Sequence, residues 1–187
     1  MKEYVSDLDK QLKDLQPQSL NKFIEVLHNA YKNNKHIFII GNGGSATTAA
    51  HFSCDLSKNT IRNLNNGDEK RFRVMSLTTN MATMTAIAND LSYDEVFSQQ
   101  LSNLMSNGDV LVAISASGNS RNIIKAAESA KKSGAIVLGM TGFDGGKLKD
   151  ISDYSIVVKS NSYGVVEDTH MIMQHIITYC LRRIKDL

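Results

Sequence analysis

Short apolar runs alternate with helical patterns along this chain, and that alternation restricts the fold more than any other feature. The apolar runs are His36–Gly41, Arg73–Leu77, Asp109–Ser115, Ala135–Thr141 and Tyr154–Val158. Continuous apolar runs of this length are typical of parallel strands buried on both faces. The helical patterns that follow are Ser45–Leu56, Met81–Asn89 with Tyr93–Met105, Arg121–Ser133 and Val165–Lys185. This order predicts an α/β protein, a three-layer α/β/α sandwich around a five-stranded parallel sheet.

The segment before the first strand carries apolar residues at helical spacing. Pro17 divides it, so the pattern predicts two amphipathic helices within residues 1–34. Their apolar positions exceed what one face of a sheet needs, as Leu8, Leu12, Leu15 and Leu20 illustrate. We therefore expect residues 1–34 to be an N-terminal helical extension that packs in an oligomer.

Length and composition limit the remaining possibilities. The 187 residues fit a single domain, residues 1–187, and 42% hydrophobic with 21% charged residues excludes a disordered chain. The apolar runs are too short to span a membrane, and the charged N-terminus does not resemble a secretion signal. Two cysteines favour a reducing cytoplasm, and a net charge of +2 gives no reason to expect a nucleic-acid partner. The polar, Asn-rich segment Ser57–Lys70 is predicted to be a mobile surface loop.

A glycine-rich loop, Gly41–Ser45, links the first strand to a helix. Glycines let backbone N–H groups approach an anion, and the positive end of the helix dipole favours one there. The loop lacks the third glycine of a dinucleotide fingerprint and the G-K-[ST] of a Walker loop, so we expect no nucleotide cofactor. A turn that serves chain geometry alone is the alternative.

A serine-rich loop, Ser115–Ser120, links the third strand to its helix. Hydroxyl donors and backbone amides at a helix N-terminus can hold a phosphomonoester. Helix capping needs one serine rather than three, so the loop favours a phosphate site. Asn89 and Asp90 close an earlier helical pattern, and they fit either a helix end or a ligand for sugar hydroxyls.

Residues that bind metals form a further set. His51 and Asp55 are four positions apart on one predicted helix, so their side chains face the same way. The last helix carries Glu167, Asp168, His170 and His175. A helical wheel aligns His175 best with Asp168, whereas Glu167 diverges from it by about 80°. Without a C-x-x-C or H-E-x-x-H pattern, this spacing fits a zinc site or buried core histidines.

Four segments together resemble the sugar isomerase (SIS) domain family, and within it the phosphoheptose isomerases. They are GNGGSATTAAHF, LTTNMATMTAIANDLSYDEVFSQQ, ISASGNSRNIIKA and MTGFDGGKL. The resemblance covers nearly the whole chain and implies the flavodoxin-like SIS fold. It also implies a cytoplasmic homotetramer that interconverts sedoheptulose 7-phosphate and D-glycero-D-manno-heptose 7-phosphate, through an enediolate, for surface-polysaccharide heptose precursors.

The resemblance also implies roles for individual residues. Substrate-binding positions would be Asn42, Gly43, Gly44, Ser45, Asn89, Asp90, Ser115, Ala116, Ser117 and Ser120, with Asp55 and Glu167. Zinc would be held by His51, Asp55, Glu167 and His175. The catalytic groups would be His175 as the acid and either Asp55 or Glu167 as the base.

Two of these positions depart from the family pattern. Asp55 stands where the family has glutamate, and Glu167 where it has glutamine, within Val165-Val-Glu-Asp168 in place of R-I-Q-E. The two changes fit a compensating exchange, an isomerase of another sugar phosphate, or a lost activity. A non-catalytic SIS protein that binds a replication initiator or senses sugar phosphates is the rival from another class. Such a protein has no reason to keep His51 and His175 opposite two carboxylates.

Overall fold

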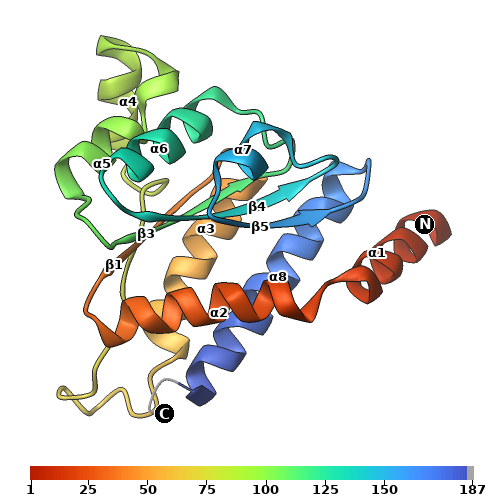
Figure 1. Cartoon of the computed structure of the whole chain (residues 1–187), viewed down its shortest axis with the longest axis horizontal. Coiled ribbons are helices and arrows are strands. Elements are labelled where there is room, and N and C mark those ends of the chain that lie inside the picture. The colour runs from red at the N-terminus through yellow and green to blue at the C-terminus, as the bar shows by residue number, and fades with distance from the viewer. Residues whose placement is uncertain (185–187) are drawn as a thin grey trace.

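A five-stranded sheet forms the centre of the computed structural model, which describes residues 1–184 (Figure 1). Its strands are β1 (His36–Ile40), β2 (Arg73–Ser76), β3 (Val110–Ser115), β4 (Ile136–Gly142) and β5 (Tyr154–Val158). Every pairing is parallel, and the strand order is β2-β1-β3-β4-β5. The five predicted strands are confirmed to within a residue at each end.

Alternate residues of the strands enter two separate cores. Ile37 and Ile39 pack with α2 (Pro17–Lys32), α3 (Gly44–Cys54) and α8 (Tyr163–Ile184) on one face of the sheet. Phe38 and Ile40 pack on the other face with α5 (Ser98–Leu104), α6 (Arg121–Lys132) and α7 (Gly146–Ile151). This alternation follows from the two-residue period of a strand. The predicted three-layer α/β/α sandwich is confirmed.

The other elements are α1 (Lys2–Asp14), the π-helix η1 (Asp55–Asn59), α4 (Met81–Asp90) and the 3₁₀ turn η2 (Tyr93–Glu95). Three helical segments of the chain differ from the sequence prediction. The segment Tyr93–Met105 is η2 followed by α5, not one helix, and α7 was not predicted because glycines precede it. The helix predicted over Val165–Lys185 begins at Tyr163, and Lys185 lies outside the described residues.

The segment Ser57–Lys70 is more ordered than a plain loop. Ser57–Asn59 belong to η1, and the hydroxyl of the buried Thr60 donates to the Leu56 carbonyl at 2.7 Å. Further along, Glu69 accepts hydrogen bonds from the backbone N–H groups of Arg62 and Asn63. The first residues of the segment Ser57–Lys70 are therefore helical, and the buried residues Leu56 and Thr60 hold this turn against the core.

The N-terminal helix α1 projects from the body of the molecule (Figure 1). The Tyr4 hydroxyl donates to Asp168 Oδ2 at 2.6 Å, and the Ser160 hydroxyl donates to Asp7 Oδ2 at 2.5 Å. Leu8 and Leu12 are only partly buried, so part of each side chain is open to contact with another subunit. Leu20 differs from the expectation for this segment because it lies in the core of its own chain.

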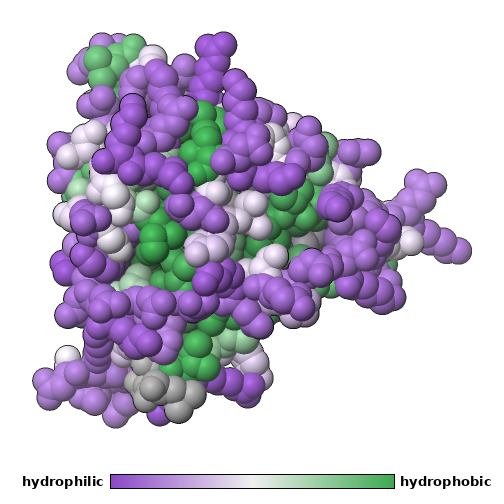
Figure 2. Space-filling model, viewed as in Figure 1, coloured by the Kyte–Doolittle hydropathy of each residue, from purple (hydrophilic) through white to green (hydrophobic). Residues whose placement is uncertain are grey.

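Helix α4 stands off the sheet at the top left of Figure 1, and none of its residues is buried. Met81 is 76% exposed, and the neighbouring Leu91 and Tyr93 are also exposed. Figure 2 shows hydrophobic surface at the same corner of the molecule. An apolar helix this exposed is typical of a surface that another protein chain covers.

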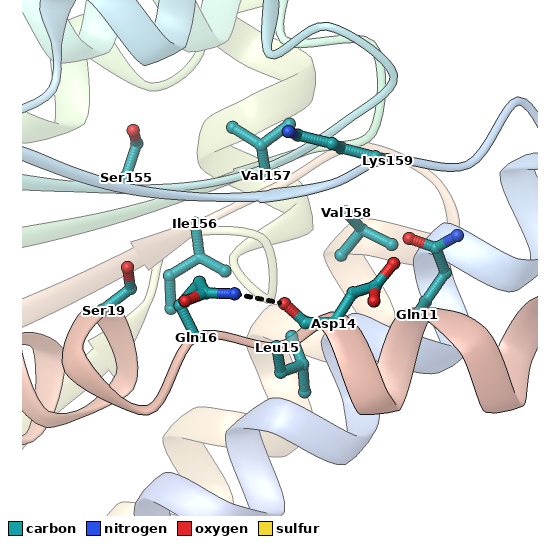
Figure 3. A pocket seen from close by; sticks show the side chains of 10 residues that line it. All are labelled: Gln11, Asp14, Leu15, Gln16, Ser19, Ser155, Ile156, Val157, Val158 and Lys159. Carbon is teal, nitrogen blue, oxygen red and sulfur yellow. Dashed lines mark hydrogen bonds between the residues drawn. The ribbon is translucent and has the colours of Figure 1, made fainter.

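A groove of about 250 Å³ runs along the free edge of β5, beside the bend between α1 and α2 (Figure 3). Its wall includes Asp14, Gln16 and Lys159, and the Gln16 amide donates to the Asp14 carbonyl at 3.1 Å. The groove lies at the sheet edge, away from the glycine and serine loops after β1 and β3.

Within residues 1–184, no helix is long and apolar enough to cross a membrane.

His170 makes stability depend on pH. Burial lowers the pKa of His170 to about 4 from the ordinary 6.5, although its bond to the Thr141 carbonyl opposes that shift. Between pH 6.5 and pH 4 the unfolded chain binds a proton that the folded chain does not, so stability falls as the pH falls. Because of His170, we expect the free energy of unfolding to fall by about 2 kcal/mol between pH 7 and pH 5.

Urea unfolding at both pH values measures that cost, with His170→Gln as the comparison. The variant lacks the titrating ring, so its stability should fall by about 2 kcal/mol less than that of the wild type. Equal losses in the two proteins would contradict the assignment.

Candidate active site

A pocket of about 210 Å³ lies where the strand order reverses, at the carboxyl ends of β1 and β3. Its wall consists of Asn42, Ser45, Ile114, Ser115, Ala116, Ser117, Ser120, Tyr163 and Glu167. In a sheet of this order, ligands bind at that switch point. The glycine and serine loops that the sequence singled out therefore meet in one pocket.

Three helices begin at this pocket. Ser45 is in the first turn of α3, Ser120 directly precedes α6, and Tyr163 is the first residue of α8. Each helix N-terminus presents free N–H groups and a partial positive charge. Three such termini at one pocket favour an anion.

The hydroxyls of the serine loop are available to a ligand. Ser120 occupies the N-cap of α6 without a capping bond from its side chain, and its Oγ lies 3.4 Å from Ser115 Oγ. The Ser117 hydroxyl accepts the backbone N–H of Asn119 at 3.2 Å and is partly exposed. For Ser120, helix capping does not explain the residue.

Two glycines of the glycine loop differ in their surroundings. Gly43 has φ +54°, in the left-handed region that favours glycine. Gly44 faces Glu167, and a Cβ atom at Gly44 would collide with the Glu167 carboxylate. The loop thus brings α3 close to the first turns of α8.

His51, Asp55 and His175 form a compact group of metal-binding side chains. Their ligand atoms all lie within 4.8 Å of one another. Asp55 Oδ2 is 3.3 Å from His51 Nε2 and 3.6 Å from His175 Nε2, and the two ring nitrogens are 3.3 Å apart. Two imidazoles and a carboxylate are a donor set that suits zinc.

Asp55 is the fixed member of this group. It is 5% exposed, and its Oδ1 accepts a hydrogen bond from the Asn59 side-chain amide at 2.6 Å. Asp55 and Asn59 are the first and last residues of η1, so the wide π turn sets this bond. Irregular turns of this kind are frequent at functional sites. Both histidine side chains remain about half exposed, which leaves the group open on one side.

Glu167 and Asp168 lie apart from that group. The Glu167 carboxylate faces Gly44 and lines the serine pocket. Asp168 accepts a hydrogen bond from the Tyr4 hydroxyl. It does not pair with His175, which is the pairing that the helical wheel suggested. Eight residues separate Glu167 from His175, about 12 Å along α8. The role of Glu167 as a fourth metal ligand stays a prediction.

Asn89 and Asp90 lie at the end of α4 and are exposed. The Asn89 amide donates to Asp90 Oδ1 at 2.9 Å, and neither residue lines the pocket. His170 is buried, with its Nε2 bonded to the Thr141 carbonyl, so it takes no part in the group around Asp55.

Sequence reasoning missed three polar residues at the pocket. Tyr163 lines it, while Asn122 and Tyr93 both bond to the side chain of Asn42. Asn122 sits two positions after Ser120 at a loop–helix junction, which was the available signal. Tyr93 gave none, because it is 51 residues from Asn42.

Comparison with known proteins decides the family. The model of the SIS domain matches residues 2–142. The chain is 41% identical to the phosphoheptose isomerase of Helicobacter pylori strain P12, over 94% of this chain and 88% of that one. It is 35% identical to a probable phosphoheptose isomerase of Thermoplasma acidophilum, over 94% of each.

The chain belongs to the SIS domain family, among its phosphoheptose isomerases. The solved structure of the Neisseria gonorrhoeae phosphoheptose isomerase agrees, with a TM-score of 0.88 at 29% identity. That comparison covers 98% of this chain and 95% of the other. The predicted family, SIS fold and enzyme class are confirmed.

The group around Asp55 predicts divalent-metal binding through its histidines. His51→Ala removes one of three donors, so we expect Zn²⁺ affinity to fall by about 100-fold or more, since even outer-shell changes cost 10–100-fold. The control is His36→Ala, because His36 is the first residue of β1 and does not belong to the group around Asp55. This variant should bind Zn²⁺ like the wild type. Calorimetric titration with Zn²⁺ measures both, and equal affinities would exclude His51 as a ligand.

Proposed function

We propose that this protein interconverts sedoheptulose 7-phosphate and D-glycero-D-manno-heptose 7-phosphate, and so supplies heptose for surface polysaccharides. The observation that carries the proposal is the placement of two sites along one pair of helices. A phosphate-type pocket lies at the N-termini of α3 and α8, and the group around Asp55 lies about two turns further along α3 and about three turns further along α8.

The spacing of these two sites fits a sugar phosphate. Gly44 to His51 is seven residues, a rise of about 10 Å along α3. A seven-carbon chain with bonds of about 1.5 Å spans roughly 7–8 Å when extended, and its phosphate adds to that. A 7-phosphate held by Ser115, Ser117 and Ser120 therefore brings its carbonyl end to His51 and His175.

The donors His51, Asp55 and His175 suit zinc, and Glu167 would have to turn from the serine pocket toward them to act as the fourth ligand that the resemblance implies. When zinc is bound there, it polarises the carbonyl and hydroxyl oxygens of the substrate. This donor set favours the isomerase over a non-catalytic SIS protein, because the structure brings both histidines to a buried carboxylate.

Asp55 and Glu167 are the two candidates for the base. Asp55 lies 3.6 Å from His175 Nε2, where the carbonyl end of the sugar is expected, whereas Glu167 lines the phosphate pocket about 12 Å away along α8. One of these carboxylates takes a proton from C1 of the ketose, and His175 gives one to the carbonyl oxygen, which yields the enediol. The same carboxylate then returns its proton to C2, and His175 recovers one from the oxygen on C1.

The assembly we propose is a cytoplasmic homotetramer. The exposed apolar helix α4 and the projecting α1 are the surfaces that further copies would cover. Both cysteines, Cys54 and Cys180, are free thiols, which suits a reducing compartment. A sugar phosphate is the expected ligand, and we expect neither nucleic acid nor a membrane as partner.

One assay tests the proposed reaction directly. Purified protein is incubated with sedoheptulose 7-phosphate, with and without added Zn²⁺, and the anomeric proton signals are followed by NMR. We expect new aldose signals that grow in proportion to enzyme. Absence of turnover with this sugar, while it still binds, would favour another sugar phosphate or a binding protein.

The phosphate site gives a prediction for Ser117→Ala. The change removes one hydroxyl donor to a charged oxygen, a bond worth about 1.5–3 kcal/mol. Affinity for sedoheptulose 7-phosphate should fall roughly 10-fold to 150-fold, while the melting temperature changes little. Calorimetry measures the affinity. Unchanged binding would place the phosphate elsewhere.

The proton transfers give a second prediction. His175→Gln and Glu167→Gln both keep a polar group of similar length but cannot exchange a proton, and loss of acid–base assistance costs about 10²–10⁴-fold in rate. We expect kcat to fall by that factor in His175→Gln and in the variant of whichever carboxylate is the base, Glu167→Gln or Asp55→Asn. His175→Gln and Asp55→Asn should also lower Zn²⁺ affinity, because both residues belong to the metal-type group.

His170→Gln serves as the control for these variants, because His170 contacts the Thr141 carbonyl and not the Asp55 group. Its kcat should stay near that of the wild type at pH 7. If Glu167→Gln retains full kcat and Asp55→Asn keeps its zinc but loses turnover, Asp55 is the base.

The oligomer gives a third prediction. Light scattering should return about four times the chain mass of 20.6 kDa. Met81→Glu places a charge on the exposed apolar helix α4, so it should shift the assembly toward smaller species without unfolding the chain. A monomeric wild type would overturn the tetramer.

A further inference from the structure

The side chains of Asn42 and Asn122 form a reciprocal amide pair at the wall of the pocket. Asn42 Nδ2 donates to Asn122 Oδ1 at 2.8 Å, and Asn122 Nδ2 donates to Asn42 Oδ1 at 2.9 Å. Asn122 is 2% exposed, in the first turn of α6, whereas Asn42 lines the pocket. The buried member therefore reaches a ligand only through its partner.

Two further bonds fix which way both amides point. The backbone N–H of Ile123 donates to Asn122 Oδ1 at 3.0 Å, which requires the oxygen of Asn122 to stay on that side. The Tyr93 hydroxyl donates to Asn42 Oδ1 at 3.0 Å. A reversed Asn122 amide would face the Ile123 N–H with its own N–H, and a reversed Asn42 would then face Asn122 donor to donor, so the pair has one favourable orientation.

Counting donors and acceptors shows what Asn42 offers to a ligand. A side-chain amide has two N–H groups and an oxygen with two lone pairs. In Asn42 both lone pairs are taken, by Asn122 and Tyr93, and one N–H is given to Asn122. Within residues 1–184 the second N–H has no partner, so Asn42 presents a donor only.

Tyr93 itself is held in place by its neighbours in η2. Glu95 accepts from the Lys125 ammonium at 2.5 Å, and Asp94 lies 3.9 Å from Arg121. The bond to Lys125 also lowers the pKa of Glu95, so the carboxylate stays charged. These contacts tie η2 to the first half of α6, the helix that carries Asn122.

We propose that Asn122 is a positioning residue that acts through Asn42 to aim one N–H donor at a phosphate oxygen of the substrate. Tyr93 supports the same orientation from the solvent side. The inference rests on the proposed function for its substrate, and it goes further by naming how the pocket wall is oriented. A phosphate fits because Asn42 shares the pocket with Ser115, Ser117 and Ser120 and offers no acceptor.

A double-mutant cycle tests this role. If Asn122 acts only through Asn42, then Asn122→Ala weakens binding of sedoheptulose 7-phosphate by about 10-fold in the wild type. In the Asn42→Ala background it should change binding by less than about 2-fold, because coupled residues are not additive. Equal losses in both backgrounds would overturn the proposal.

Milder variants guard against misfolding. Asn122→Asp keeps the size and the acceptor for Ile123 but cannot donate to Asn42 and adds a buried negative charge, whereas Tyr93→Phe removes one exposed hydroxyl without adding charge. Both should raise KM several-fold with kcat nearly unchanged, since the bond is made equally in ground and transition states. Gln100→Ala is the control, because Gln100 is another buried amide with two bonds, to Leu77 and Val96, and it does not line the pocket. It should lower stability and leave KM unchanged, and a KM shift as large as that of Asn122→Asp would overturn the specific role.

Inorganic phosphate separates the possible failures. Its affinity should fall in the Asn122 variants along with that of the sugar phosphate, and a loss seen only with the sugar phosphate would overturn the phosphate assignment. If the wild type binds the sugar phosphate without turning it over, the proposed reaction is wrong. The double-mutant cycle still tests the role of Asn122 in that case, because it measures affinity and not turnover. If the wild type is active and the cycle is additive, only the inference about Asn122 fails.

Discussion

The convergence of three helix N-termini on one edge of the sheet is the constraint on which this site depends. Because β1 and β3 are neighbours at the switch point, the loops after them meet, and the helices that follow, α3 and α6, both start there. Helix α8 adds a third start through Tyr163. Unpaired N–H groups at these ends are costly to bury without an acceptor. An anion satisfies them, and the serine hydroxyls add donors at the same place.

The pairing of α3 with α8 then determines the rest of the geometry. Gly44 faces the Glu167 carboxylate where the two helices begin, and about two turns later the same pair of helices brings His51 next to His175. The π turn at Asp55 holds its carboxylate against both rings while Asn59 occupies the other oxygen. A single helix pair therefore presents an anion pocket and a metal-type donor group at a separation of about 10 Å, which follows from the rise of a helix.

Local patterns sufficed for the elements and the loops, whereas contacts between distant residues did not follow from them. Parallel strands buried on both faces have continuous apolar runs, so these runs placed all five strands, and the loops after the neighbouring β1 and β3 meet at the switch point. Helix α7 was missed because glycines precede it, and Leu20 was assigned to an interface although it fills its own core. The wheel paired Asp168 with His175, but Tyr4, 164 positions away, takes that carboxylate. Likewise, no spacing rule brings Asn122 to Asn42 across 80 residues.

The position of Glu167 sets the charge balance of the whole site. Each helix N-terminus carries about half a positive charge, so three of them offset roughly one carboxylate and leave little for a phosphate dianion. The described residues that line the pocket include no lysine or arginine, and Glu167 adds a negative charge. A divalent metal ion held by the group around Asp55, as we propose, would supply part of the remaining compensation. Two divalent charges of opposite sign at about 10 Å attract by only about 2 kcal/mol in water, and more where the pocket excludes water. If Glu167 stands where the family has an amide, as the resemblance implies, a phosphate bound in this pocket would depend more on a metal ion held around Asp55.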